Sequence, residues 1–172
     1  MARLTPDTFR RVLTPANVRT LQVIESALAA GVTLFAVVIF FLYLTRSAVP
    51  GDAADVQLIR MLTYGHLLVA VGVYTVVGRV YAMMLGGTGA PATAEEAWNR
   101  LRTAGIVRLA LLEGVALFGL VVCLLAVIAG VMARHPGYWI NLISAVGMVG
   151  FVALHFPTTD RLEQTFRTHF GG

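Results

Sequence analysis

Four long stretches of this chain are almost entirely apolar, and the polar and charged residues gather between them and at the two ends. The apolar stretches cover residues 21–45, 58–85, 105–133 and 138–158. A bilayer core of about 30 Å needs about 20 apolar residues in a helix, so each stretch is long enough to cross a membrane. The pattern predicts an all-α integral membrane protein with four transmembrane helices.

The composition supports this prediction and argues against a soluble enzyme. Hydrophobic residues make up 58% of the 172 residues and charged residues 13%, whereas soluble domains have about half and about a quarter. The later spans are as long as the first, so we expect no cleaved signal peptide. The single cysteine, Cys123, excludes a disulfide within the chain and a cysteine-based metal centre.

The spans divide the chain into five segments. Residues 1–20 form an N-terminal interfacial segment, 21–85 the first transmembrane hairpin, 86–104 a loop, 105–158 the second hairpin, and 159–172 a tail. The hairpins are expected to be two tandem copies of one unit.

Two Thr-Pro pairs near the N-terminus predict helix starts. Thr14-Pro15 and Thr5-Pro6 each place a capping side-chain oxygen before a proline at the first helical position. The first pair introduces the first span, and the second introduces a short helix. We expect the short helix to lie on the membrane surface, with Phe9, Val12 and Leu13 toward lipid and Arg10 and Arg11 toward headgroups. A frayed polar tail is the alternative.

The loop over residues 86–104 is glycine-rich between Gly86 and Pro91. Phosphate-binding glycine loops follow a strand and continue into Lys-Ser/Thr, and neither feature is present, so no such loop is expected. Thr93 is placed to cap a helix that contains Glu95, Glu96 and Trp98.

Arginines predict the orientation of the spans, because positive residues are enriched on the cytoplasmic side. With both termini in the cytoplasm, ten arginines lie inside and three outside. The inner set is Arg3, Arg10, Arg11, Arg19, Arg79, Arg100, Arg102, Arg108, Arg161 and Arg167, and the outer set is Arg46, Arg60 and Arg134. We therefore expect a multi-pass protein of a bacterial-type inner membrane. Tyr138 and Trp139 are then anchors at the outer interface.

The first and third spans share a pattern of small residues at an offset of 83 positions. Ala27 and Gly31 align with Ala110 and Gly114, and each pair is followed by Leu-Phe. Small residues one turn apart let membrane helices approach closely. We expect these four residues to line seams between helices, and the offset indicates a parallel internal repeat.

Glu113 is an acid inside an apolar run, and ionisable residues within spans are functional candidates. Arg108 lies about 7.5 Å before it along the helix axis. Glu25 and Arg79 are expected at a similar depth. The four charges allow two interpretations, because an isolated charge in a dry environment is costly. They form an inner charge network that joins the helices, or Glu113 carries a proton or cation.

The segment around Glu113 carries a resemblance to a known family. Residues 101–121 read LRTAGIVRLALLEGVALFGLV, which resembles the carboxylate-bearing helix of the proteolipid c subunit of rotary ATP synthases. The resemblance implies that Glu113 is the ion-carrying acid. The whole chain resembles uncharacterised four-span bacterial membrane proteins that contain Ala-Leu-Leu-Glu-Gly.

The histidines do not form a pattern typical of haem or metal binding. His66 is expected near the outer end of the second span and His155 near the inner end of the fourth, so they cannot share one iron. His66 is expected to bond to a neighbouring helix or to interfacial water. Tyr64, Tyr74 and Thr75 could line a cavity or quinone groove, or could simply pack and bond within the bundle. No cofactor and no nucleic-acid partner is expected.

These observations favour a non-enzymatic membrane protein. Its expected role is structural or accessory, as a homo-oligomer or as a subunit of a larger, for instance bioenergetic, membrane assembly. The alternative is a proton- or cation-translocating module that uses Glu113.

Overall fold

The computed structural model of the chain describes residues 5–46, 52–87 and 89–170, and all of its regular elements in these ranges are helices. They are α1 (Pro6–Val12), α2 (Pro15–Thr45), α3 (Ala53–Gly86), α4 (Ala94–Ile128), α5 (Val131–Arg134), the 3-10 helix η1 (Pro136–Leu142), α6 (Ile143–His155) and α7 (Thr159–Phe170). Four apolar segments are long enough to cross a membrane: α2, α3, α4 and η1 with α6. This confirms the prediction of an all-helical chain with four candidate spans.

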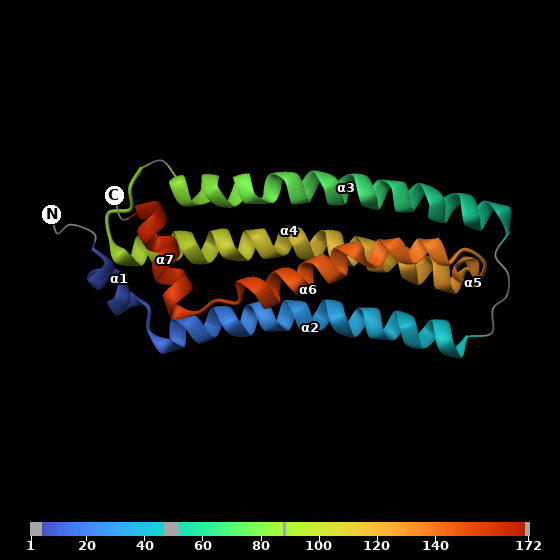
Figure 1. Cartoon of the computed structure of the whole chain (residues 1–172), viewed down its shortest axis with the longest axis horizontal. Helices are drawn as coiled ribbons and strands as arrows, with labels where there is room; N and C mark the ends of the chain where they lie inside the picture. Colours follow the sequence, from blue (N-terminus) through green and yellow to red (C-terminus); the bar gives the residue numbers. More distant parts are fainter. Residues whose placement is uncertain (1–4, 47–51, 88, 171–172) are drawn as a thin grey trace.

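Helix α4 is the centre of the bundle. It packs against α2, α3 and α6, and α6 also packs against α2. Figure 1 shows α2 and α3 on opposite sides of α4, although they follow one another in the chain and were predicted as one hairpin. The short helices α1 and α7 lie at the same end of the bundle, so the two ends of the chain are close together (Figure 1).

The predicted helix starts at Thr5, Thr14 and Thr93 are confirmed. The hydroxyl of each accepts a hydrogen bond from the backbone N–H three residues later, which satisfies one of the unpaired donors of the first turn. The helix that begins after Thr93 continues into the third span without a break. The connection between α3 and α4 is therefore much shorter than the predicted loop over 86–104.

At one end of the bundle, α1, α7 and the first turns of α4 enclose a hydrophobic core. We call this region the capped end. The Phe9 and Phe166 rings are both fully buried and stack at 4.1 Å between centroids. Trp98 and Leu101 of α4 belong to the same core. Phe9 therefore packs against protein, not lipid, and the surface location predicted for α1 is not confirmed.

The fourth span differs from the prediction at its start. Gly130 adopts a left-handed conformation with φ of 69° just after α4 ends at Ile128, before the predicted end at residue 133. Pro136 then opens η1, a 3-10 turn, and regular α-helix begins only at Ile143. The tighter 3-10 turn places η1 against both α3 and α4.

Candidate functional site

A buried polar cluster joins α3 to η1 and α6 in the middle of the bundle. We call Thr63, His66, Asn141 and Ser144 the histidine cluster; all four are buried, and His66 and Asn141 are fully so. His66 Nδ1 lies 2.9 Å from Asn141 Oδ1, and His66 Nε2 lies 2.9 Å from Ser144 Oγ. Asn141 Nδ2 donates to Thr63 Oγ1 at 2.9 Å and to the Tyr138 carbonyl at 2.8 Å. The expectation that His66 bonds to a neighbouring helix is confirmed.

The bonding pattern assigns the proton on His66. The amide nitrogen of Asn141 must be the atom facing the Tyr138 carbonyl, because a carbonyl oxygen can only accept. Asn141 Oδ1 then accepts from the Nδ1–H of His66, and the neutral ring accepts from the Ser144 hydroxyl at Nε2. Both ring nitrogens are therefore satisfied without a charge, as burial in a low-dielectric environment favours.

Gly119 of α4 makes room for the histidine cluster. A Cβ added at this position would collide with the Asn141 carbonyl oxygen and would lie 2.8 Å from two atoms of the His66 ring. The neighbouring Phe118 meets the same ring edge to face, with 5.6 Å between centroids. Glycine is therefore required at 119 by the close approach of η1 and His66.

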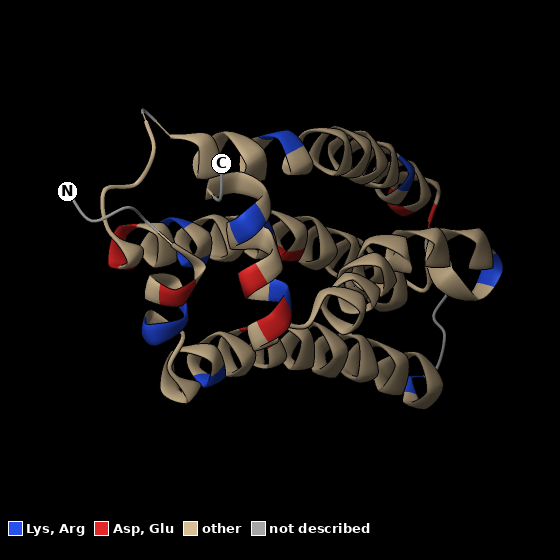
Figure 2. Cartoon of the chain, turned by 60° about the vertical axis from the view of Figure 1, so that its left-hand side comes forward, with Lys and Arg blue, Asp and Glu red and all other residues tan. Residues whose placement is uncertain are grey.

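A second polar site lies near the capped end, where a cavity of about 480 Å³ opens between α2, α3, α4, α6 and α7. We call it the basic cavity. The charged and titratable side chains that line it are Glu25, Tyr81, Arg108, His155, Arg161 and His169. Figure 2 shows charged residues gathered at this end of the bundle.

Arg108 is held in the basic cavity by aromatic rings. The carbon of its guanidinium lies 4.1 Å from the centre of the Tyr81 ring and 4.7 Å from that of Phe151. Its Nε is buried and has no hydrogen-bond partner among the described residues. Such cation–π contacts stabilise the charge without using its N–H donors. The two rings thus hold the guanidinium in place, and a ligand in the cavity would have to bind its Nη atoms, because the Nε atom is buried.

The predicted inner charge network of Glu25, Arg79, Arg108 and Glu113 is brought together only in part. Glu25 and Arg108 line the same cavity. Arg79 is exposed on α3, and Glu113 is half-buried on α4. No ion pair within 4.0 Å joins any of these four charges in the part of the chain that the structure describes.

The four predicted seam residues do not lie between helices of one chain. Ala27, Gly31, Ala110 and Gly114 are all exposed. A Cβ on Gly31 or Gly114 would have no described atom within 4 Å except the helix's own backbone and neighbours. Contact at these positions requires lipid or another molecule, and close packing here remains a prediction about assembly.

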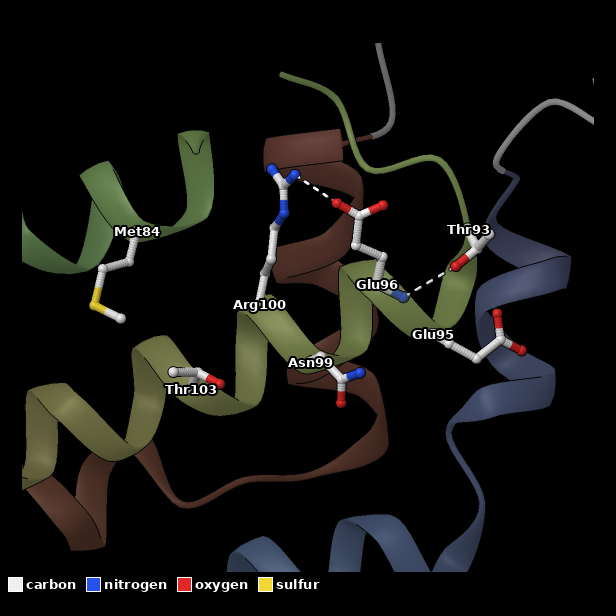
Figure 3. A pocket seen from close by; sticks show the side chains of 7 residues that line it. All are labelled: Met84, Thr93, Glu95, Glu96, Asn99, Arg100 and Thr103. Carbon is white, nitrogen blue, oxygen red and sulfur yellow. Dashed lines mark hydrogen bonds and ion pairs between the residues drawn. The ribbon is translucent and has the colours of Figure 1, made fainter. Parts of the chain in front are cut away.

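A second cavity, of about 530 Å³, lies beside the start of α4 and is shown in Figure 3. Its main ionic groups are already engaged. Glu96 accepts from the Ala92 N–H at 2.8 Å and from Arg100 Nη2 at 2.6 Å. Arg100 also donates to the Gly89 carbonyl at 2.6 Å. These bonds hold the connection between α3 and α4 against the first turns of α4.

The same arginine explains a glycine of the predicted loop. Gly87 has φ of 47°, and a Cβ there would lie 2.5 Å from Arg100 Nη1. Its conformation and the close approach of the guanidinium both favour glycine.

Glu163 of α7 is the central charge of the capped end. Its carboxylate is buried and accepts from Arg10 Nε at 2.7 Å and from Arg167 Nη2 at 2.5 Å. The hydrogen bond from Arg10 and then that from Arg167 hold the pKa of Glu163 below its ordinary value. The pairing with Arg10 connects α7 to α1.

The predicted interfacial aromatics pack at the opposite end of the bundle. Trp139 meets Tyr43 edge to face at 5.4 Å between centroids and lies 6.2 Å from Phe40. Tyr138 is half-buried, and its carbonyl accepts from Asn141. Trp139 therefore connects η1 to α2, and an anchoring role for Tyr138 and Trp139 remains a prediction.

Metal-binding geometry is not found in the described ranges. No group of three or more His, Cys, Asp or Glu side chains is placed to hold a metal ion there. Cys123 is a free, buried thiol among apolar residues.

Comparisons with known proteins give no relative: no family model, no curated protein and no solved structure matches this chain.

Two groups of functional candidates were not found from the sequence. Asn141 and Ser144, which bond to His66, lie 75 and 78 positions after it in the chain. No local spacing in the sequence therefore links them to His66. The basic cavity depends on α7, which was predicted as a tail. Its spacing of Leu162, Glu163, Phe166 and Phe170 is typical of an amphipathic helix and could have indicated it.

Proposed function

We propose that the protein is a non-enzymatic integral membrane protein with a structural or accessory role. It acts as a homo-oligomer or as a subunit of a larger membrane assembly, for instance a bioenergetic one. The proposed location is a bacterial-type inner membrane, with both termini in the cytoplasm.

The observation that carries this proposal is the large apolar surface that the chain leaves uncovered. In the most apolar 18-residue stretch of α4, 50% of the residues are buried. In the corresponding stretches of α2 and α3, only 11% and 6% of the residues are buried. Two of the four spans therefore present most of their side chains outward, where lipid or other helices can cover them.

The small residues on these outward faces support a role in assembly. Gly31 and Ala27 are exposed on α2, and Gly114 and Ala110 are exposed on α4. Van der Waals packing and interhelical bonds drive helix association in lipid, and small residues favour it by letting backbones come close. A Cβ added at Gly31 or Gly114 would meet no described side chain of this chain within 4 Å.

Substitution of the two glycines tests the proposal. Gly31→Leu and Gly114→Leu are expected to reduce self-association or recovery of partner subunits, measured by size-exclusion chromatography with light scattering. The thermal stability of the isolated chain should not fall, because both positions face outward. Val38→Leu is the control, since it is a small volume change at another exposed position of α2. Unchanged assembly in both glycine variants would contradict a role for these faces.

A second candidate function is ion translocation through Glu113. Glu113 is half-buried and has no hydrogen bond or ion pair with any described residue. An acid that carries an ion must be accessible and free to change its protonation state, whereas an acid of a structural network must be paired. The lack of a described partner favours the carrier role over the network.

Chemical labelling separates the two functions. If Glu113 carries an ion, a hydrophobic carbodiimide should modify it in membranes, and protons or sodium ions should protect it. Glu25→Gln serves as a control for modification of the other membrane acid. Absence of modification at Glu113 would leave the structural role as the only proposal.

A further inference from the structure

We propose that the basic cavity binds the phosphate-bearing headgroup of an anionic phospholipid, with an acyl chain lying in an apolar groove between α2 and α6. The inference concerns a ligand site and stands apart from the proposed role in assembly.

The charge of the cavity favours an anion. Two arginines, Arg108 and Arg161, line it against one acid, Glu25. His155 and His169 also line it, and each uses Nδ1 to bond a backbone carbonyl of its own helix. No hydrogen bond joins the Nε2 atom of either histidine to a described residue.

The two arginines have hydrogen-bond donors to offer. Arg108 is positioned by its contacts with Tyr81 and Phe151, and it makes no hydrogen bond to a described residue. Arg161 uses Nη1 alone, toward the carbonyls of Leu154 and Phe156. Guanidinium groups with free donors are suited to the oxygen atoms of phosphate, which they can bind through two parallel hydrogen bonds.

The cavity lies at the depth of lipid headgroups if the spans cross a membrane as predicted. Arg108 follows the start of the predicted third span by about 4.5 Å along the helix axis. Basic pockets between transmembrane helices on the cytoplasmic side bind anionic headgroups. This depth argues for a lipid as the source of the phosphate and against a soluble anion.

A separate apolar groove lies further along α2 and α6, and it shares no lining residue with the basic cavity. It has a volume of about 420 Å³ and is lined by residues of α2, η1 and α6, among them Val32, Thr33, Ala36, Leu142, Ala145 and Gly150. Gly150 lies one turn of α6 before Leu154, which lines the basic cavity. A molecule with a charged head and an apolar chain matches this order of polar and apolar surfaces.

Native mass spectrometry with defined lipids tests the proposal. The full-length protein in a mild detergent is mixed with phosphatidylglycerol or with phosphatidylcholine of the same chains, and bound lipid is counted. We expect preferential retention of phosphatidylglycerol. Arg108→Gln and Arg161→Gln should each reduce that retention about fivefold, as expected for loss of one basic residue near a headgroup. Glu25→Gln should increase it, because it removes the opposing charge.

Matched variants control for general effects of charge and size. Arg79→Gln removes an arginine on the exposed face of α3, outside the cavity, and should leave retention unchanged. Gly150→Leu fills the groove and should reduce retention, whereas Gly72→Leu adds the same bulk at an exposed site on α3 and should not.

Two sets of results would overturn the proposal or its assignment to a lipid. Equal retention of the two lipids, or an equal loss in Arg79→Gln and Arg108→Gln, would overturn the proposal. Displacement of the lipid by inorganic phosphate, together with no effect of Gly150→Leu, would identify a soluble phosphate site and overturn the lipid assignment. If Arg108→Gln does not fold, the opposite effects expected of Arg161→Gln and Glu25→Gln decide the question.

Discussion

His66 and Asn141 are joined by a hydrogen bond of 2.9 Å between Nδ1 and Oδ1, and both side chains are fully buried. The bond connects α3 to η1, the irregular start of the fourth span. In a bilayer, non-helical backbone is tolerated only where protein or a polar cavity satisfies it. Within the histidine cluster, Asn141 Nδ2 also satisfies the Tyr138 carbonyl of this 3-10 helix.

The first prediction concerns the space next to this cluster. Gly119→Ala is expected to lower the free energy of unfolding by about 1–3 kcal/mol, because the new Cβ would displace the His66 ring or the Asn141 carbonyl. Thermal unfolding in detergent measures the loss. Gly114→Ala is the control, since it adds the same group to the exposed face of the same helix. Equal stability of both variants would show that the cluster tolerates the extra atom.

The second prediction concerns pH and the capped end. The pKa of Glu163 is held below its ordinary value of 4.5 by the hydrogen bonds from Arg10 and Arg167. A carboxylate whose pKa is lowered in the folded state contributes stability that is fully present above 4.5. That contribution is lost as the pH falls below 4.5 and the folded-state pKa is passed.

Thermal unfolding at neutral pH and below pH 4.5 checks this expectation. Glu163→Gln should be less stable than the parent at neutral pH, and the difference should shrink in acid. Glu95→Gln is the control, because Glu95 is exposed and makes no hydrogen bond or ion pair with a described residue. A difference that stays constant over this pH range would exclude the carboxylate as its source.

The sequence predicted the features that depend on local pattern. Long apolar runs indicated the four candidate spans, and the threonines at 5, 14 and 93 indicated three helix starts. Features that depend on contacts between distant segments were predicted wrongly or not at all. Phe9 was expected in lipid, but it stacks on Phe166, which is more than 150 positions away. No local pattern near Phe9 distinguishes a lipid partner from a protein partner.

The inner charge network also depends on contacts that a local sequence pattern does not predict. The depth of a charge could be estimated from helix geometry, and Glu25 and Arg108 line one cavity. The direction in which a side chain points around its helix depends on which neighbours are present. Arg79 and Glu113 have no ion-pair partner in the described ranges.

The third prediction concerns orientation. In a Cys123→Ala background, Ala90→Cys should react with a membrane-impermeant thiol reagent only from the cytoplasmic side. Ala53→Cys should react only from the outside. Position 53 is exposed and avoids Asp52, whose side chain caps α3. The reverse labelling pattern would overturn the orientation predicted from the arginines.

The fourth prediction concerns Glu113. Because it has no described partner, Glu113→Gln is expected to unfold at the same temperature as the parent protein in detergent. A charge network predicts another result, since breaking a buried pair costs about 3–5 kcal/mol. In that case adding Arg79→Gln or Arg108→Gln should restore part of the loss. A destabilised single variant that either double variant rescues would establish the network.

Native mass spectrometry of the protein extracted gently from its own membrane tests the central claim most directly, because it reports stoichiometry and bound subunits together. An accessory or structural role predicts masses that correspond to several copies of the 18.5 kDa chain, or to this chain with other membrane subunits. The Gly31→Leu and Gly114→Leu variants should lose these species. Recovery of single chains only, from membranes in which cross-linking also detects no neighbour, would contradict the proposed role.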